Sequence, residues 1–115
     1  MNYIGTSDLL HDLSAWIDRG NTHRDPEAVR WGRLSKVAEE CGEVISAFIA
    51  ATGQNPRKGV CGTIGDVEQE LLDVAVTALC AVAHLRGNDH GDVIAMLSAK
   101  VTAVADRAGI AVEIA

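Results

Sequence analysis

Hydrophobic residues recur at three- and four-residue spacing over four segments of this chain, and that spacing predicts amphipathic helices. Residues that commonly bound helices flank the segments: the run Asp25-Pro26-Glu27 opens the second, and Gly53 follows it. The four predicted helices cover residues 7–20, 25–53, 66–86 and 89–107. We therefore expect an all-α fold, a four-helix bundle formed as a single domain by residues 1–115.

The sequence also predicts two helix caps and the character of the C-terminal tail. Ser7 is the expected cap of the first helix, and Asp66 with Gln69 is the expected capping box of the third. The short apolar tail at residues 110–115 fits either a strand or a packing arm.

A long connection separates the second and third predicted helices. Residues 53–65 contain four glycines and one proline, and a loop of this length inside a small helical domain is usually functional or mobile. We therefore regard its two cationic residues, Arg57 and Lys58, as candidate ligand contacts.

The third predicted helix is apolar on nearly all sides. Between Leu71 and Leu85 only Asp73, Thr77 and His84 interrupt a run of Ala, Val, Leu and Cys. A helix of this kind needs cover on every side, which a four-helix monomer supplies poorly. The pattern favours a homo-oligomer, most simply a dimer, with a tetramer as the alternative.

Composition narrows the classes of function. The net charge of −6 argues against an extended nucleic-acid-binding surface, and the sequence contains neither an apolar run of membrane-spanning length nor an N-terminal secretion signal. The three cysteines form no metal-binding pattern and are expected to be reduced thiols in a cytoplasmic protein, with Cys41 and Cys80 in the core. His84 is expected to be structural, and the other three histidines, His11, His23 and His90, are expected at the surface.

Carboxylates are paired on two of the predicted helices. Glu40 and Glu43 lie three residues apart on the second helix, and Glu70 and Asp73 do the same on the third. Residues at this spacing share one helix face. Unpaired carboxylates beside an apolar face repel one another, and a divalent cation removes that cost. All-oxygen ligation suits Mg²⁺, with Mn²⁺ as a substitute, whereas a solvated acidic face with salt bridges is the alternative.

The same residues carry a resemblance to a known family. Glu39-Glu40-Cys41-Gly42-Glu43, followed after 26 residues by Glu70-Leu71-Leu72-Asp73, resembles the E-E-x-x-E and E-x-x-D signature of the MazG-like all-α nucleotide pyrophosphohydrolases. The similarity extends over about residues 31–100. It implies a magnesium-dependent enzyme that cleaves a nucleoside triphosphate between the α and β phosphates, releasing the monophosphate and pyrophosphate.

The resemblance also implies roles for individual residues. The metal ligands would be Glu40, Glu43, Glu70 and Asp73, and Glu39 would orient or deprotonate the attacking water or pair with a cation. Phosphoryl transfer chiefly needs charge neutralisation and an aligned water, so these roles agree with the acidic pattern.

Several further residues are candidates for substrate binding. Lys36, Arg57 and Lys58 could contact phosphates, and Trp31 could stack on a base or pack in the core or an interface. Lys100 matches a lysine common in the family, but Ser98 replaces the asparagine expected two residues before it.

Two alternative functions remain at this point. One is a narrow-specificity relative that cleaves dUTP or phosphoribosyl-ATP. The other is a catalytically silent helical bundle that binds a nucleotide or a partner protein.

Overall fold

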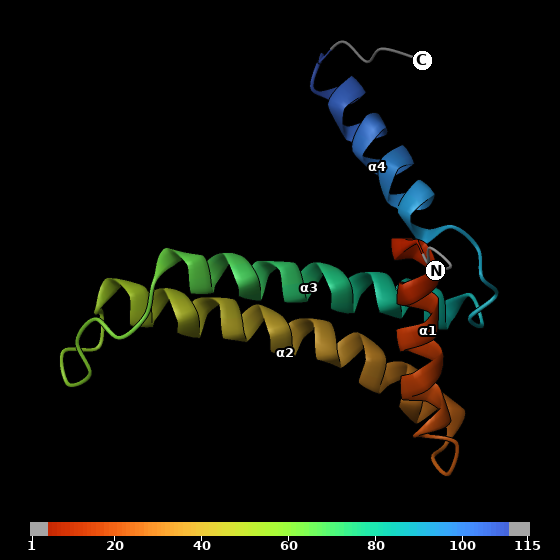
Figure 1. Cartoon of the computed structure of the whole chain (residues 1–115), viewed down its shortest axis with the longest axis horizontal. Coiled ribbons are helices and arrows are strands. Elements are labelled where there is room, and N and C mark those ends of the chain that lie inside the picture. The colour runs from red at the N-terminus through yellow and green to blue at the C-terminus, as the bar shows by residue number, and fades with distance from the viewer. Residues whose placement is uncertain (1–4, 111–115) are drawn as a thin grey trace.

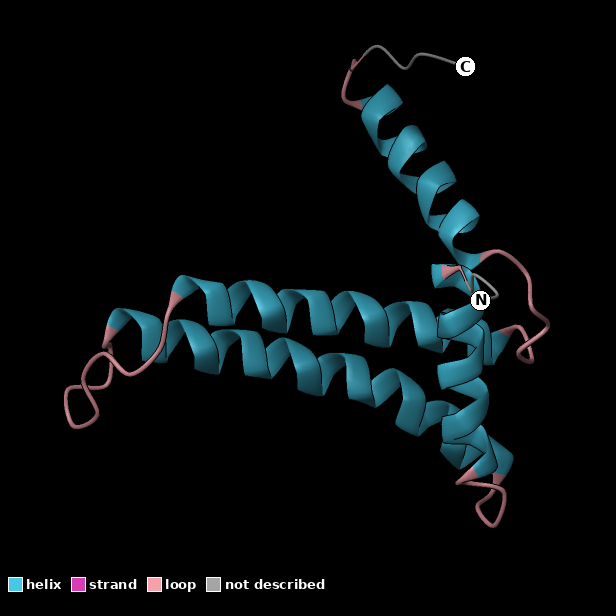
Figure 2. Cartoon of the chain, in the orientation of Figure 1, coloured by secondary structure: helices cyan, strands magenta, loops and turns pink. Residues whose placement is uncertain are grey.

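A computed structural model describes residues 5–110, which contain four α-helices and no strand (Figures 1 and 2). The helices are α1 (Thr6–Arg19), α2 (Pro26–Thr52), α3 (Ile64–Leu85) and α4 (Val93–Arg107). The predicted all-α class and the number of helices are confirmed. Most of the C-terminal tail considered above lies outside the described residues.

The two longest helices, α2 and α3, form an antiparallel hairpin (Figure 1). Helix α1 crosses the end of this hairpin that is remote from the α2–α3 loop, and it packs mainly on α3. Helix α4 contacts α1 and α3 and then projects away from the hairpin, so that most of its length stands apart from α2 and α3 (Figure 1).

The helix ends follow local capping chemistry. The Asp25 carboxylate accepts a hydrogen bond from the backbone N–H of Ala28, as predicted for the start of α2. The predicted caps of the first and third helices were wrong. Helix α1 starts after Gly5, and α3 starts after Thr63. The Thr63 hydroxyl accepts a hydrogen bond from the backbone N–H of Asp66, and the Asp66 carboxylate accepts one from the backbone N–H of Thr63. Thr63 is thus the cap, and Asp66 is its partner within the capping box.

Few hydrophobic side chains are buried within one chain. Among the described residues, the larger buried hydrophobic side chains are Leu10 and Val93. The other buried hydrophobic residues, Cys80, Ala81 and Ala83, are small and lie where α1 crosses α3. Cys80 is therefore in the core as predicted, but Cys41 is exposed on α2, so its predicted core position was wrong.

His11 is buried, which contradicts the surface position predicted for it. Its side chain is 1% exposed, and its Nε2 atom is hydrogen-bonded to the carbonyl of Gly91. The bond joins α1 to the segment that leads into α4. The periodicity of the first helix identified only its apolar residues, so a histidine used to bind a distant backbone carbonyl was not recognised.

A buried polar network joins the first three helices. The Arg33 guanidinium donates to Asp18 Oδ1 at 2.9 Å, to the Ser14 hydroxyl at 2.9 Å and to the Cys80 carbonyl at 2.9 Å. The other Asp18 oxygen, Oδ2, lies 2.8 Å from His84 Nδ1. The structural role predicted for His84 agrees with this contact. The network fixes α1 across the hairpin.

Large apolar side chains of α3 remain exposed in the single chain. Leu71, Leu72 and Val76 are 53%, 57% and 43% exposed, so one chain leaves part of the apolar surface of α3 uncovered. Among the described residues, no helix is long and apolar enough to cross a membrane.

Candidate functional site

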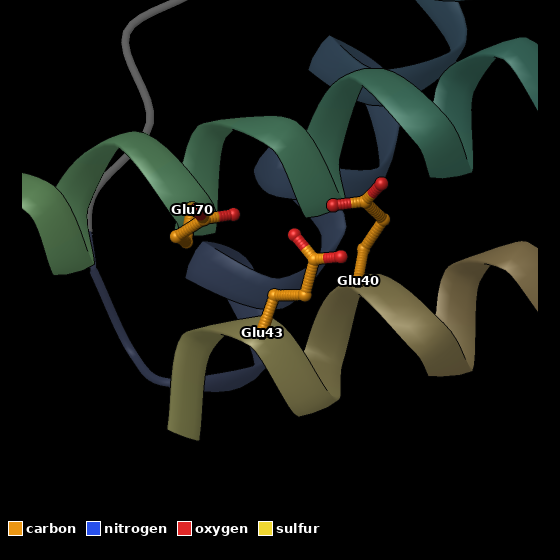
Figure 3. A group of neighbouring side chains, drawn as sticks. All are labelled: Glu40, Glu43 and Glu70. Carbon is orange, nitrogen blue, oxygen red and sulfur yellow. The ribbon is translucent and has the colours of Figure 1, made fainter. Parts of the chain in front are cut away.

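Three carboxylates from the two helices of the hairpin converge between these helices (Figure 3). Glu40 and Glu43 come from α2, and Glu70 comes from α3. One oxygen of each side chain lies within 4.8 Å of one oxygen of the other two. The predicted pairing of acids across two helices therefore brings three of the four expected metal ligands together.

Glu70 is the carboxylate with the least favourable surroundings. Its Oε2 atom is buried and has no hydrogen-bond partner. Burial raises the pKa of Glu70 above its ordinary value, and repulsion from Glu43, Asp73 and Glu40 raises this pKa further. The carboxylate is thus held in a place where a positive charge would stabilise it.

Asp73, the fourth expected ligand, lies one turn beyond Glu70 on α3 and is exposed. It does not belong to the group of three carboxylates within 4.8 Å, but its charge is close enough to raise the pKa of Glu70. Asp73 therefore lies at the edge of the cluster.

Lys36 and Glu39 interact beside the cluster. Lys36 Nζ lies 3.1 Å from Glu39 Oε1 and 3.5 Å from Glu40 Oε1. The hydrogen bond to Glu39 and the charges of both glutamates raise the pKa of Lys36. Glu39 is thus paired with a cation in this structure, which was one of the two roles considered for it.

The donor set fits a hard divalent cation. It consists of carboxylate oxygens alone, and the unpartnered buried oxygen of Glu70 is an atom that a cation would satisfy. Zn²⁺ would favour nitrogen or sulfur ligands, whereas Mg²⁺ and Mn²⁺ are compatible with oxygen. Glu40, Glu43 and Glu70 are the residues that would hold such an ion.

An open apolar groove of about 840 Å³ adjoins this cluster. Lys36, which pairs with Glu40, lines it, and so does Thr77, one turn beyond Asp73. The groove lies among α1, the first half of α2 and the second half of α3, and its lining residues include Leu13, Ile17, Val29, Gly32, Val76 and Cys80. Its size and mixed lining suit a small organic ligand with an anionic end.

The other predicted substrate contacts are more remote. Arg57 and Lys58 are exposed in the α2–α3 loop and do not line the groove, although Lys58 lines a small pocket with Ser46, one turn beyond Glu43. Trp31 is 65% exposed and does not line the groove.

Lys100 lies in the middle of α4, and α4 projects away from the hairpin (Figure 1). The single chain therefore does not bring Lys100 to the acidic cluster.

Sequence reasoning did not identify the groove. The structure buries Arg33 under α1 and makes it part of the groove wall. The signal present in the sequence was the position of Arg33 beside apolar residues on the face of α2 nearest the core. No pattern in the sequence showed which face α1 would cover.

No protein-family model, curated protein or solved structure matches the chain.

Proposed function

We propose that this protein is a magnesium-dependent nucleotide pyrophosphohydrolase that cleaves a nucleoside triphosphate into the monophosphate and pyrophosphate. The proposal is carried by one observation: a buried, unpartnered oxygen of Glu70 lies beside Glu40 and Glu43, next to an apolar groove. The resemblance to the MazG-like family, which rests on the same carboxylates, supports the choice of reaction.

The proposed site combines carboxylates that would bind the metal with a groove that would bind the base and sugar. Glu40, Glu43 and Glu70 would hold the cation, with Asp73 at the edge of the site. A bound Mg²⁺ would neutralise phosphate charge and lower the pKa of a bound water. Glu39 would orient the attacking water once Lys36 turns to the phosphates, and the groove would accept the base and sugar.

Three free thiols agree with a reducing compartment such as the cytoplasm.

The direct test measures pyrophosphate release from ribo- and deoxyribonucleoside triphosphates, including dUTP, with Mg²⁺, with Mn²⁺ and with a chelator. We expect release that requires the metal and differs among the bases, because the base would lie in the groove. In parallel, calorimetric titration with Mn²⁺ alone should detect binding at the carboxylates. Metal binding without release from any nucleotide would contradict the proposed reaction and favour a silent binding protein.

Replacing both Arg57 and Lys58 by alanine is expected to raise KM for the nucleotide by about three- to tenfold and to leave kcat nearly unchanged. The two cations lie on an exposed loop and would contact only the outer phosphates. Steady-state kinetics would measure the effect, with Arg30→Ala as an exposed-cation control. An unchanged KM would exclude the loop from substrate binding.

A further inference from the structure

His11 is buried with one of its ring nitrogens unsatisfied. Its side chain lies on α1 beside the start of α4 (Figure 1) and is 1% exposed. The Nε2–H group donates to the Gly91 carbonyl, because a carbonyl oxygen can only accept. The neutral ring then has its lone pair on Nδ1, and this buried atom has no hydrogen-bond partner among the described residues. Such a nitrogen is available to a hydrogen-bond donor or to a metal ion.

A second imidazole lies beside this one at a spacing that suits a shared ion. The ring centroids of His11 and His90 are 5.4 Å apart. A tetrahedral Zn²⁺ ion about 2.1 Å from one nitrogen of each ring would separate the two centroids by about 5 Å. His90 is exposed, so an ion could approach the buried ring of His11 from solvent on the side of His90.

The backbone of His90 has a conformation that L-amino acids rarely adopt. Its φ angle is 58°, in the left-handed region. Asn88 has a similar φ of 55°, and its side chain donates a hydrogen bond to Asp18 Oδ2 at 2.8 Å. The conformation of Asn88 is thus supported by a buried contact, whereas that of His90 places its ring against His11. Strained residues of this kind are frequent at sites that bind ligands.

Two aspartates bring negative charge to the same place. Asp89 is already engaged, because its Oδ1 accepts from the backbone N–H of Gly91 and its Oδ2 is in an ion pair. Asp92 caps α4 through Oδ1, which accepts from the backbone N–H of Ala95 at 2.9 Å. This hydrogen bond lowers the pKa of Asp92 most, and a positive charge on His11 contributes to the lowering. Asp92 is thus an exposed carboxylate close to the two histidines.

We infer that His11 and His90 bind a divalent transition-metal ion, best matched by Zn²⁺, with Asp92 as a third ligand. Imidazole nitrogens favour Zn²⁺ over Mg²⁺, and a bond from the other ring nitrogen to a backbone carbonyl is typical of metal-binding histidines. Asp92 would turn toward the ion, since the three ligands do not yet lie within 4.8 Å of one another. The ion would join α1 to the start of α4. The site shares no residue with the acidic cluster and is independent of the proposed reaction.

Imidazole ¹⁵N NMR of the full chain during a titration with Zn²⁺ tests the site. Without metal, His11 should be the Nε2–H tautomer. Zn²⁺ should then shift Nδ1 of His11 and one nitrogen of His90, while the signals of His23, which is exposed, and His84 stay in place. Mg²⁺ should shift none of the four histidines. A readout on each histidine separates this site from Zn²⁺ bound at the free thiols.

A substitution gives a second readout. His90→Asn should keep the fold, because asparagine tolerates positive φ well, and an unshifted His84 signal would verify this. The Zn²⁺ affinity measured at His11 should fall at least about tenfold, since even the loss of a group that only supports a metal ligand has an effect of this size. His23→Asn, the same change at an exposed histidine, should bind Zn²⁺ as the wild type does. An Nδ1–H tautomer of His11, a His11 signal that excess Zn²⁺ leaves in place, or equal affinity in His90→Asn would overturn the inference.

Discussion

Replacing Glu43 by glutamine is expected to lower kcat/KM for nucleotide hydrolysis by at least about 100-fold. Even a residue that only hydrogen-bonds to a metal ligand typically lowers metal affinity or activity by about 10- to 100-fold when it is replaced. Within residues 5–110, Glu43 supplies one of the three carboxylates that meet between α2 and α3. An amide of the same shape keeps the volume but removes the negative charge that would bind the cation. Pyrophosphate release at saturating Mg²⁺ measures the effect.

The same substitution should have the opposite effect on the stability of the metal-free protein. Burial and the charges of Glu43, Asp73 and Glu40 raise the pKa of Glu70, so ionised Glu70 destabilises the fold at pH values above the ordinary pKa of glutamate. Glu43→Gln removes one of these repulsions. We therefore expect a melting temperature a few degrees higher than that of the wild type at pH 7 and smaller stabilisation by added Mn²⁺.

Glu68→Gln is the matched control, because Glu68 is an exposed acid on α3 outside the cluster. It should change neither hydrolysis nor stabilisation by Mn²⁺. Wild-type activity in Glu43→Gln would contradict the assignment of this residue as a metal ligand. A lower melting temperature of the metal-free variant would show that Glu43 makes a stabilising contact instead of a repulsive one.

The four helices could be predicted because their signals are local. Periodic apolar residues and the run Asp25-Pro26-Glu27 depend on neighbours within a few positions, and α2 begins where these predict. The predicted cap of α3 was misplaced by three residues, because Asp66 can serve either as a cap or as the partner of a cap, and in the structure Thr63 is the cap. The direction of α4 follows a connection in which Gly87, Asn88 and His90 have positive φ, and periodicity does not encode these backbone conformations.

The acidic site was predictable for a similar reason. A spacing of three residues places Glu40 and Glu43 on one face, and only the pairing of two long helices was needed to bring Glu70 to them. The apolar groove was not predictable, since its wall requires α1 to cross a particular face of the hairpin. Burial of Arg33 and His11 was not predictable for the same reason, because each is hydrogen-bonded to a backbone carbonyl far away in the sequence.

Replacing Asp18 by asparagine is expected to destabilise the protein by about 3 kcal/mol, the lower end of the cost of removing one partner of a buried ion pair, because the Asp18 side chain is 23% exposed. Arg33 would keep its charge while only 8% exposed, with neutral oxygens as its remaining acceptors. Burial opposes ionisation of Asp18, but hydrogen bonds from His84 and Asn88 and the charges of His84 and Arg33 outweigh it and lower its pKa below 3.8. Urea unfolding at a fixed protein concentration would measure the loss.

The lowered pKa also predicts how this loss depends on pH. A group with a lower pKa in the folded state stabilises the fold above its unfolded pKa, and this contribution disappears as the pH falls through the folded value. The difference in stability between the wild type and Asp18→Asn should therefore shrink as the pH falls below about 4. Asp12→Asn, an exposed change on the same helix, should have little effect at either pH. A difference that persists unchanged at pH 3 would mean that the ion pair with Arg33 does not hold α1 on the hairpin, and that Asp18 acts there through neutral hydrogen bonds alone.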